Sequence, residues 1–261
     1  MDLQLKGKIA VVSAASRGLG RAVAEQLAKE GCNLFICSRN AEAITKAARE
    51  LRSGYGVEAD GFQADLSDKQ QIDAWIEHVA SRTGHIDALV CNAGGPPSGS
   101  FLDITEEDWD RAIRTNLMSV VRLLRGFYPM MKINGARVVT IASASVKMPI
   151  PGLILSNTLR TGIVGLMKTL SIEWAQDGIL LNTVCPGRIM TDRVEELDRA
   201  RAEREGRSLE DVRKESIRNI PLGRAGKPEE LADLCAYLLS ARNTYLTGST
   251  YFVDGGSVKA L

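Results

Sequence analysis

Short β-branched runs alternate with long amphipathic segments along this chain, and that alternation allows few folds. The apolar runs predict strands at residues 8–14, 33–38, 57–65, 86–92, 136–143, 179–185 and 250–256. Apolar residues at helical spacing predict helices at residues 18–30, 41–52, 68–82, 105–132 and 153–177. Strands that alternate with helices pair in parallel through right-handed crossovers. We therefore expect an α/β fold with a doubly wound parallel sheet of about seven strands and helices on both faces.

The length of 261 residues suits one domain, residues 1–261, because no linker or short repeat divides the chain. In a doubly wound sheet, ligands bind at the carboxyl ends of the strands, where the strand order reverses. The charge-rich segment 192–220 interrupts the alternation, and we expect it to form a lid over that site. It is too charged and irregular to indicate the shape of a substrate.

Composition excludes several classes of function. The net charge of +1 predicts neither nucleic-acid binding nor attachment to an anionic membrane. Residues 1–10 lack the apolar core of a signal peptide, and no apolar run is long enough to span a membrane. Five scattered cysteines, an odd number, favour reduced thiols in the cytoplasm. His78 and His85 fit no metal-binding motif, so we expect no metal.

The first predicted strand runs into "SAASRGLGRA" at residues 13–22, where Gly18 and Gly20 occupy a strand-to-helix turn. Such a turn lets the backbone approach a pyrophosphate, and the helix amides can bind it. Arg39 follows the second strand, about 20 residues further on, where an arginine accepts the 2′-phosphate of NADP. Arg17 adds a second guanidinium in the loop. The alternative is that both arginines are solvated surface charges.

Further motifs extend this pattern over nearly the whole chain. They are "SAASRGLG" (13–20), "ADLSD" with Asp65, "CNAGG" (91–95), "RTNLMS" with Asn116, Ser143 after the fifth predicted strand, "CPGRIMTD" (185–192) and "LTGSTYFVDGG" (246–256). Together they resemble the short-chain dehydrogenase/reductase family. "SAASRGLG" departs from that family's TGxxxGxG loop at Ser13 and Ala14, and "CNAGG" departs from NNAG at Cys91. A Cβ at residue 14 is costly if the backbone there needs a positive φ.

The resemblance implies a Rossmann-type fold, NADP(H) as cofactor and hydride transfer to or from a small carbonyl or alcohol substrate, with overall similarity to 3-oxoacyl-carrier-protein reductases. It also implies a homo-oligomer, expected to be a tetramer, formed through the long helices after the fourth and fifth strands and through the last strand. The cofactor contacts it implies are Ser13, Ser16, Arg17, Gly18, Leu19, Gly20, Ser38, Arg39, Asp65, Leu66, Asn92, Ala93, Gly94, Arg160, Pro186, Gly187, Ile189 and Thr191.

The catalytic positions depart from the family. Its members use an asparagine, a serine, a tyrosine that exchanges the proton with the substrate oxygen, and a lysine that lowers the pKa of that tyrosine. Asn116 and Ser143 match the first two. The tyrosine and lysine positions, 13 and 17 residues after Ser143, hold Ser156 and Arg160. We therefore predict Asn116, Ser143, Ser156 and Arg160 as the catalytic set.

This exchange leaves the proton donor open. A serine hydroxyl is a far weaker acid than a phenol, whose pKa is about 10. Arginine keeps its charge but does not release protons in proteins. Lys147 or a water molecule in the space left by the ring could donate the proton, although a solvated loop lysine is the simpler interpretation. Tyr128 and Lys132 do form a YxxxK sequence, but they precede Ser143, and we expect Tyr128 to pack in the core.

Two interpretations follow. The favoured one is an NADP(H)-dependent oxidoreductase with an altered catalytic tetrad, since Asn116 and Ser143 are retained. The other is an NADP(H)-binding sensor or partner protein with little or no turnover, which Ser156 and Arg160 favour. Cys91 and Cys185 end strands next to the expected cofactor, where we interpret them as small buried apolar side chains.

Overall fold

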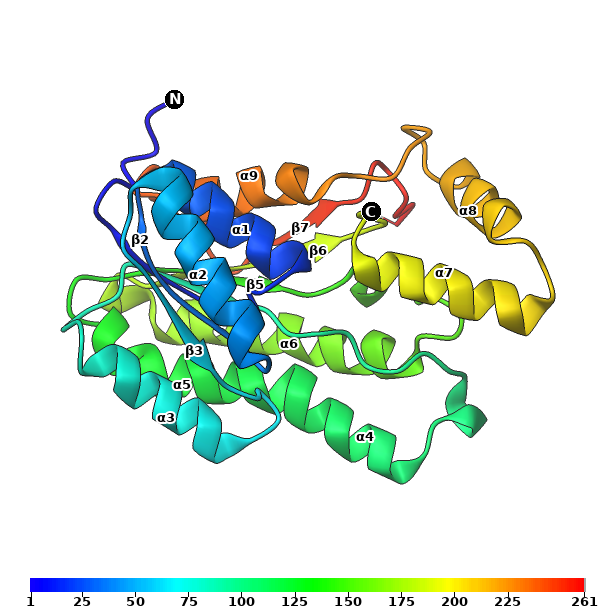
Figure 1. Ribbon diagram of the computed structural model, residues 1–261, viewed down its shortest axis with the longest axis horizontal. Coiled ribbons are helices and arrows are strands. Elements are labelled where there is room, and N and C mark those ends of the chain that lie inside the picture. The colour runs from blue at the N-terminus through cyan, green and yellow to red at the C-terminus, as the bar shows by residue number, and fades with distance from the viewer. Residues whose placement is uncertain (261) are drawn as a thin grey trace.

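A computed structural model describes residues 1–260, and its centre is one parallel sheet of seven strands in the order β3-β2-β1-β4-β5-β6-β7 (Figure 1). The strands are β1 (Ile9–Val12), β2 (Asn33–Ser38), β3 (Ala59–Gln63), β4 (Ala88–Cys91), β5 (Arg137–Ile141), β6 (Leu180–Pro186) and β7 (Thr250–Val253). The strand order reverses between β1 and β4. The predicted doubly wound sheet is confirmed.

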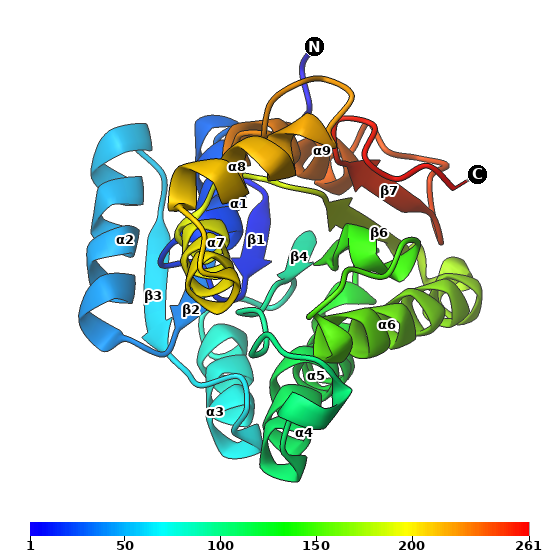
Figure 2. The same cartoon turned by 90° about the vertical axis from the view of Figure 1, so that its right-hand side faces the viewer.

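Helices cover both faces of the sheet (Figure 2). The α-helices are α1 (Gly18–Lys29), α2 (Ala41–Tyr55), α3 (Lys69–Ala80), α4 (Glu106–Ala112), α5 (Ser119–Met131), α6 (Ile154–Glu173), α7 (Asp192–Glu205), α8 (Leu209–Arg218) and α9 (Pro228–Leu239). One apolar cluster packs α1, α2 and α9 on the sheet, and a second packs α3, α5 and α6 on the other face. Both clusters use strand side chains, which explains why the strands are continuous apolar runs. Across residues 1–260, no helix is both long and apolar enough to traverse a membrane.

The single helix predicted over residues 105–132 is interrupted by a π-helical turn. α4 runs directly into the π-helix η2 (Ile113–Met118), which continues as α5. A π-turn closes i→i+5 hydrogen bonds and therefore holds one more residue than an α-turn. Apolar periodicity did not reveal it, because the extra residue only changes the phase of the pattern. The turn contains Asn116, which is buried.

The predicted lid segment forms α7 and α8, which lie beyond the carboxyl end of β6 in Figures 1 and 2. Few apolar side chains are buried in this pair, chiefly Ala202 and Val212. Ion pairs replace an apolar core: the buried carboxylate of Asp198 pairs with Arg188 and lies 3.8 Å from Arg213. The segment is therefore held to the domain more by charge than by apolar burial.

Candidate functional site

The turn between β1 and α1 has the strained backbone of a phosphate-binding loop. Ala14 adopts a φ of 51°, a region that a side chain disfavours, and Gly18 has a φ of 61°. At Gly20, a Cβ would lie 2.4 Å from the carbonyl oxygen of Ala14 and 2.6 Å from the side-chain nitrogen of Asn92. Only glycine fits there, because α1 begins in close contact with the ends of β1 and β4. The positive φ expected at residue 14 is thus present, with alanine occupying it.

Ser13 fastens this turn to β4. Its hydroxyl donates to the carbonyl oxygen of Asn92 at 2.7 Å and accepts from the Asn92 backbone amide at 2.8 Å. The side-chain amide of Asn92 in turn donates to the carbonyl oxygen of Ala14 at 3.3 Å. Ser13 is fully buried, so its hydroxyl serves the alignment of the two strand ends. The Ser13 hydroxyl, which was predicted to contact the cofactor, is therefore already engaged with Asn92.

The amino end of α1 is open to an anion. Its first turn contains no acidic side chain, and its N-cap residue, Arg17, makes no capping hydrogen bond through its side chain. Unpaired amide groups and the helix dipole favour a phosphate at such an end. Ser16 and Leu19, which are half-buried, flank Arg17 and Gly18 on this loop. These features fit the pyrophosphate of a dinucleotide.

The two predicted phosphate-binding arginines differ in their surroundings. Arg39 is exposed just after β2, next to Ser38, whose hydroxyl donates to the carbonyl oxygen of Asn40 at 3.2 Å. Arg17 is also exposed, but its guanidinium lies 3.4 Å from Asp192 and 4.0 Å from Glu196, both on α7. A 2′-phosphate at Arg17 would compete with these carboxylates of α7.

The loop after β3 holds two of the predicted cofactor contacts, Asp65 and Leu66. The Asp65 carboxylate accepts from the backbone amide and the hydroxyl of Ser67, both at 2.8 Å. The Asp65 backbone amide donates to the side-chain oxygen of Gln71 at 2.9 Å. Leu66 is almost fully buried. The loop is therefore fixed by its own hydrogen bonds before any ligand binds.

Arg160 is the most unusual residue of the site, because its charge is buried without a partner carboxylate. Its side chain is 5% exposed, and none of residues 1–260 forms an ion pair with it. It donates to the carbonyl oxygens of Ile141 at 2.8 Å and Ala93 at 3.4 Å, and to Oδ1 of Asn116 at 3.0 Å. Burial lowers the pKa of Arg160 to about 10, so the guanidinium is charged at neutral pH.

Ser143 and Ser156 come from segments that pack together around this guanidinium. Ser143 caps the short helix η3 (Ala144–Val146), and its hydroxyl accepts from the Ser145 amide at 3.1 Å. Ser156 is half-buried in the first turn of α6, one turn before Arg160 on the same helix. α6 contacts both η3 and η2. The structure therefore brings the segments bearing all four predicted catalytic residues to the carboxyl ends of β4 and β5.

The alternative YxxxK pair lies elsewhere. The Tyr128 hydroxyl donates to Asp177 at 2.7 Å, and Nζ of Lys132 lies 3.1 Å from the same carboxylate. Tyr128 also packs on Trp174, with ring centroids 4.7 Å apart. Asp177 precedes β6, so this cluster lies at the amino ends of the strands, opposite Arg160. Tyr128 and Lys132 hold α5 to the turn after α6.

Other candidate proton donors are poorly placed or unreactive. Lys147 is exposed at the end of η3. Cys91 and Cys185 are fully buried, and burial raises their pKa values to about 12 and about 11. Both thiols are therefore protonated at neutral pH, in agreement with their interpretation as small buried side chains.

The segment after β6 connects the site to the lid. Pro186 ends β6 and Gly187 follows it, Ile189 is buried and pairs with Gly226, and Thr191 is the N-cap of α7. The sequence analysis missed Arg193, which follows at the second position of α7. Its guanidinium donates to the carbonyl oxygen of Pro96 at 2.6 Å and lies over Gly95, next to the exposed Gly94. Arg193 and the Arg17 contacts thus attach α7 to both sides of the site.

Comparisons with known proteins cover nearly the whole chain. A family model described as enoyl-(acyl carrier protein) reductase matches residues 13–258. Oxidoreductase UcpA of Salmonella typhimurium is 36% identical over 256 residues, covering 97% of this chain and 95% of that protein. The 3-oxoacyl-[acyl-carrier-protein] reductase FabG of Aquifex aeolicus is 32% identical over 257 residues, covering 98% and 99%. The crystal structure of L-sorbose reductase from Gluconobacter frateurii, complexed with NADPH and L-sorbose, matches with a TM-score of 0.95 at 32% identity over 100% of both chains.

The strain at Ala14 gives a first prediction. A left-handed conformation costs roughly 1–2 kcal/mol for a residue with a Cβ. Replacement of Ala14 by glycine keeps this conformation and removes that cost. The more flexible unfolded chain offsets part of this gain, so we expect stabilisation of about 0.5–1 kcal/mol. Scanning calorimetry should show a Tm higher by roughly 1–3 °C.

The adjacent Ala15 is the matched control, because it is fully buried and has no positive φ. Ala15→Gly should lower the Tm, since it removes a packed methyl group and adds flexibility. An Ala14→Gly variant that is destabilised as much as Ala15→Gly would contradict the interpretation of the turn.

Proposed function

Because this chain belongs to the short-chain dehydrogenase/reductase family, we propose that it is an NADP(H)-dependent oxidoreductase that interconverts a small carbonyl compound and its alcohol with an altered catalytic tetrad. The observation that carries the proposal is the set of buried contacts that Arg160 makes with Asn116 and the ends of β4 and β5. These contacts give a fixed wall beside a turn suited to a pyrophosphate. We also propose a cytoplasmic location, where the five free cysteines would stay reduced.

NADP(H) supplies the hydride when bound, and the chain supplies binding and orientation. The open amino end of α1 would hold the pyrophosphate, and Arg17 with Arg39 would hold the 2′-phosphate. Asp65 and Leu66 would border the adenine, and the segment from Pro186 to Thr191 would border the nicotinamide. Arg160 would face the nicotinamide ribose. Such positioning alone can lower a barrier by roughly 7–11 kcal/mol.

Ser143 would orient the substrate oxygen, while Ser156 leaves room where the family carries a tyrosine ring. Proton transfer by a positioned acid usually contributes about 10²–10⁴ in rate, and Ser156 is too weak an acid to supply that factor. Arg160 cannot replace the acid, because it is buried and its N–H groups donate to three acceptors within the chain. We propose that a water molecule beside Ser156 delivers the proton.

A second candidate is a protein that binds NADP(H) with little or no turnover. The observation that favours it is that Arg193 and the Arg17 contacts fasten α7 to both sides of the site. A screen of ketones and alcohols by nicotinamide absorbance separates the two. Consumption of NADPH or formation of NADPH with any substrate supports the enzyme, and tight NADPH binding without turnover supports the binding protein.

Cofactor preference is the second prediction. Phosphate-binding arginines and the lack of an acidic residue after β2 should make NADPH bind about tenfold tighter than NADH, or about 1.4 kcal/mol. Titration calorimetry measures both Kd values. Arg39→Gln should remove most of the difference by weakening NADPH alone, whereas Arg49→Gln, an exposed arginine on α2, should leave both unchanged. Equal Kd values in the unmodified protein would refute the proposed specificity.

The third prediction concerns the catalytic positions. The double variant Ser156→Tyr with Arg160→Lys should raise kcat on simple ketones by about 10²-fold, because it restores a phenol and the group that lowers its pKa. Each single variant should gain less, since the lysine acts mainly through the tyrosine. Tyr128→Phe is the control and should leave kcat unchanged, because Tyr128 bonds Asp177 far from the site. A loss of activity in Tyr128→Phe would show that our assignment of the catalytic positions is wrong.

Oligomeric state is the fourth prediction. We propose a homotetramer, supported by the family resemblance, with contacts through α6, on which Gly162, Gly165 and Ile172 are exposed, Ile172 at 71%. Light scattering should give a mass near four times 28.3 kDa. Ile172→Asp should reduce that mass, whereas Ile133→Asp, an exposed residue beyond α5, should not. A monomeric unmodified protein would overturn the proposal.

A further inference from the structure

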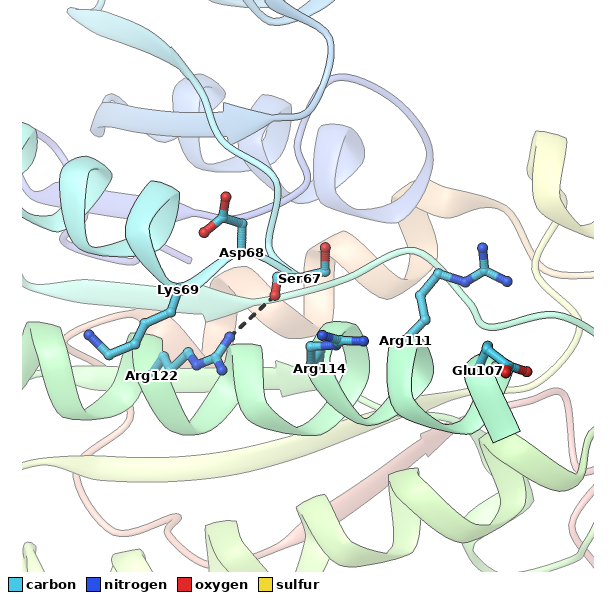
Figure 3. Close-up of a pocket in the computed structure, with 7 residues that line it drawn as sticks. All are labelled: Ser67, Asp68, Lys69, Glu107, Arg111, Arg114 and Arg122. Atoms are coloured by element: carbon cyan, nitrogen blue, oxygen red, sulfur yellow. Dashed lines mark hydrogen bonds between the residues drawn. The ribbon is translucent and has the colours of Figure 1, made fainter. Parts of the chain in front are cut away.

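A positively charged groove lies between the amino end of α3 and the continuous rod formed by α4, η2 and α5 (Figure 3). Its volume is about 660 Å³. Four cationic side chains line it, and they are Lys69, Arg111, Arg114 and Arg122. The carboxylates of Asp68 and Glu107 and the polar Ser67 complete the lining. None of these residues belongs to the catalytic set or to the predicted cofactor contacts.

The π-turn η2 is what places Arg114 and Arg122 on the same face. In an uninterrupted α-helix, residues eight apart differ by about 80° around the axis, since each residue turns about 100°. The π-turn holds one extra residue, so one π-turn and one α-turn together span eight residues. Arg114 and Arg122, which are eight residues apart, therefore lie on the same face. Figure 3 shows the side chains of Arg111, Arg114 and Arg122 on the side of the rod that faces Ser67.

The positive charge of the groove is only partly neutralised. Lys69 pairs with Asp73, and Arg111 pairs with Asp108. Within residues 1–260, neither Arg114 nor Arg122 forms an ion pair. The half-buried Arg122 donates only to the carbonyl oxygen of Ser67, at 3.4 Å. Two guanidinium groups in one groove therefore remain free for an anion.

The two carboxylates that line the groove, those of Asp68 and Glu107, do not form ion pairs with Arg114 or Arg122 in the part of the chain that the structure describes. Asp68 caps α3, and its oxygens accept from the Gln70 amide at 2.8 Å and from the Gln71 side chain at 3.0 Å. Glu107 lies at the opposite end of the groove, in the first turn of α4, and is exposed. Arg122 nevertheless helps to lower the pKa of Asp68, after the Gln71 and Gln70 hydrogen bonds. The centre of the groove thus keeps a net positive charge.

We propose that this groove is a second anion-binding site, which takes a polyvalent phosphate such as pyrophosphate or the phosphate group of a larger ligand. Guanidinium groups bind phosphate oxygens in a bidentate way and form strong, charge-assisted hydrogen bonds. Two turns separate the backbone of Arg114 from that of Arg122, about 11 Å along the axis, and their long side chains can converge on one anion of two or more phosphates. Lys69 and Arg111 would add longer-range attraction.

The site adjoins the loop after β3 that holds Asp65, without including that residue. Ser67 lines the groove, and its amide and hydroxyl both donate to the Asp65 carboxylate. An anion in the groove and a dinucleotide at Asp65 would therefore share a rigid loop while using different side chains. The two ligands should be able to bind together, which distinguishes this site from the phosphate positions at Arg17 and Arg39.

Titration calorimetry with inorganic pyrophosphate at constant ionic strength tests the proposal. With NADPH present in excess to fill the cofactor site, we expect saturable binding of one pyrophosphate per chain. The double variant Arg114→Gln with Arg122→Gln should bind at least about tenfold more weakly, or about 1.4 kcal/mol. Arg125→Gln is the matched control, because Arg125 is exposed on α5 and does not line the groove.

Arg114→Lys with Arg122→Lys keeps the charge and should bind between the unmodified protein and the glutamine variant. This second pair separates loss of the site from loss of the fold, which thermal unfolding checks in parallel. The absence of saturable binding would overturn the proposal, as would unchanged binding in the glutamine double variant. Pyrophosphate binding that disappears when NADPH is added would also overturn it, because the anion would then occupy the cofactor site.

Discussion

The buried guanidinium of Arg160 is the interaction around which the site is organised. It joins α6 to the last residue of β5, to the segment after β4 and to Asn116 in the π-turn. A buried charge is costly unless its donors are satisfied, and here neutral oxygens satisfy them in place of a carboxylate. Any side chain at residue 160 that made fewer bonds would leave buried oxygens from three segments without a donor. The geometry of the catalytic positions therefore depends on this one side chain.

Strain at the start of α1 complements that arrangement. Ala14 holds a positive φ, Gly20 is packed against its carbonyl oxygen, and Ser13 and Asn92 hold the two strand ends together. Such strain persists only where the surrounding contacts overdetermine it, and it is concentrated at functional sites. The same turn leaves the helix amides free, and the chain places no acidic residue there. Binding of an anion would thus satisfy helix amides that the chain itself leaves free.

Much of this fold could be predicted from the sequence, because buried parallel strands are continuous apolar runs and helices carry a periodic apolar face. The predicted strands and helices lie within a few residues of their limits, although a π-turn divides the helix at 105–132 and α9 was not predicted, and the seven-stranded sheet is confirmed. The sequence also predicted that the segments bearing Asn116, Ser143, Ser156 and Arg160 meet at one site, because the spacing of these residues matches a known family. The π-turn and the contacts of Arg193 could not be predicted, because neither leaves a periodic or local signature.

The sequence by itself determined the order of strands and helices, the turn that suits a phosphate and the absence of tyrosine and lysine at the predicted catalytic positions. These properties are local, since each depends on residues that are close together along the chain. The tertiary structure decided which partners the charged side chains find: Arg160 bonds Asn116, 44 residues away, Arg17 meets α7, and Tyr128 bonds Asp177. Charged side chains are long and flexible, so only the packing of distant segments determines whether each one binds a carbonyl oxygen, a carboxylate or an incoming anion.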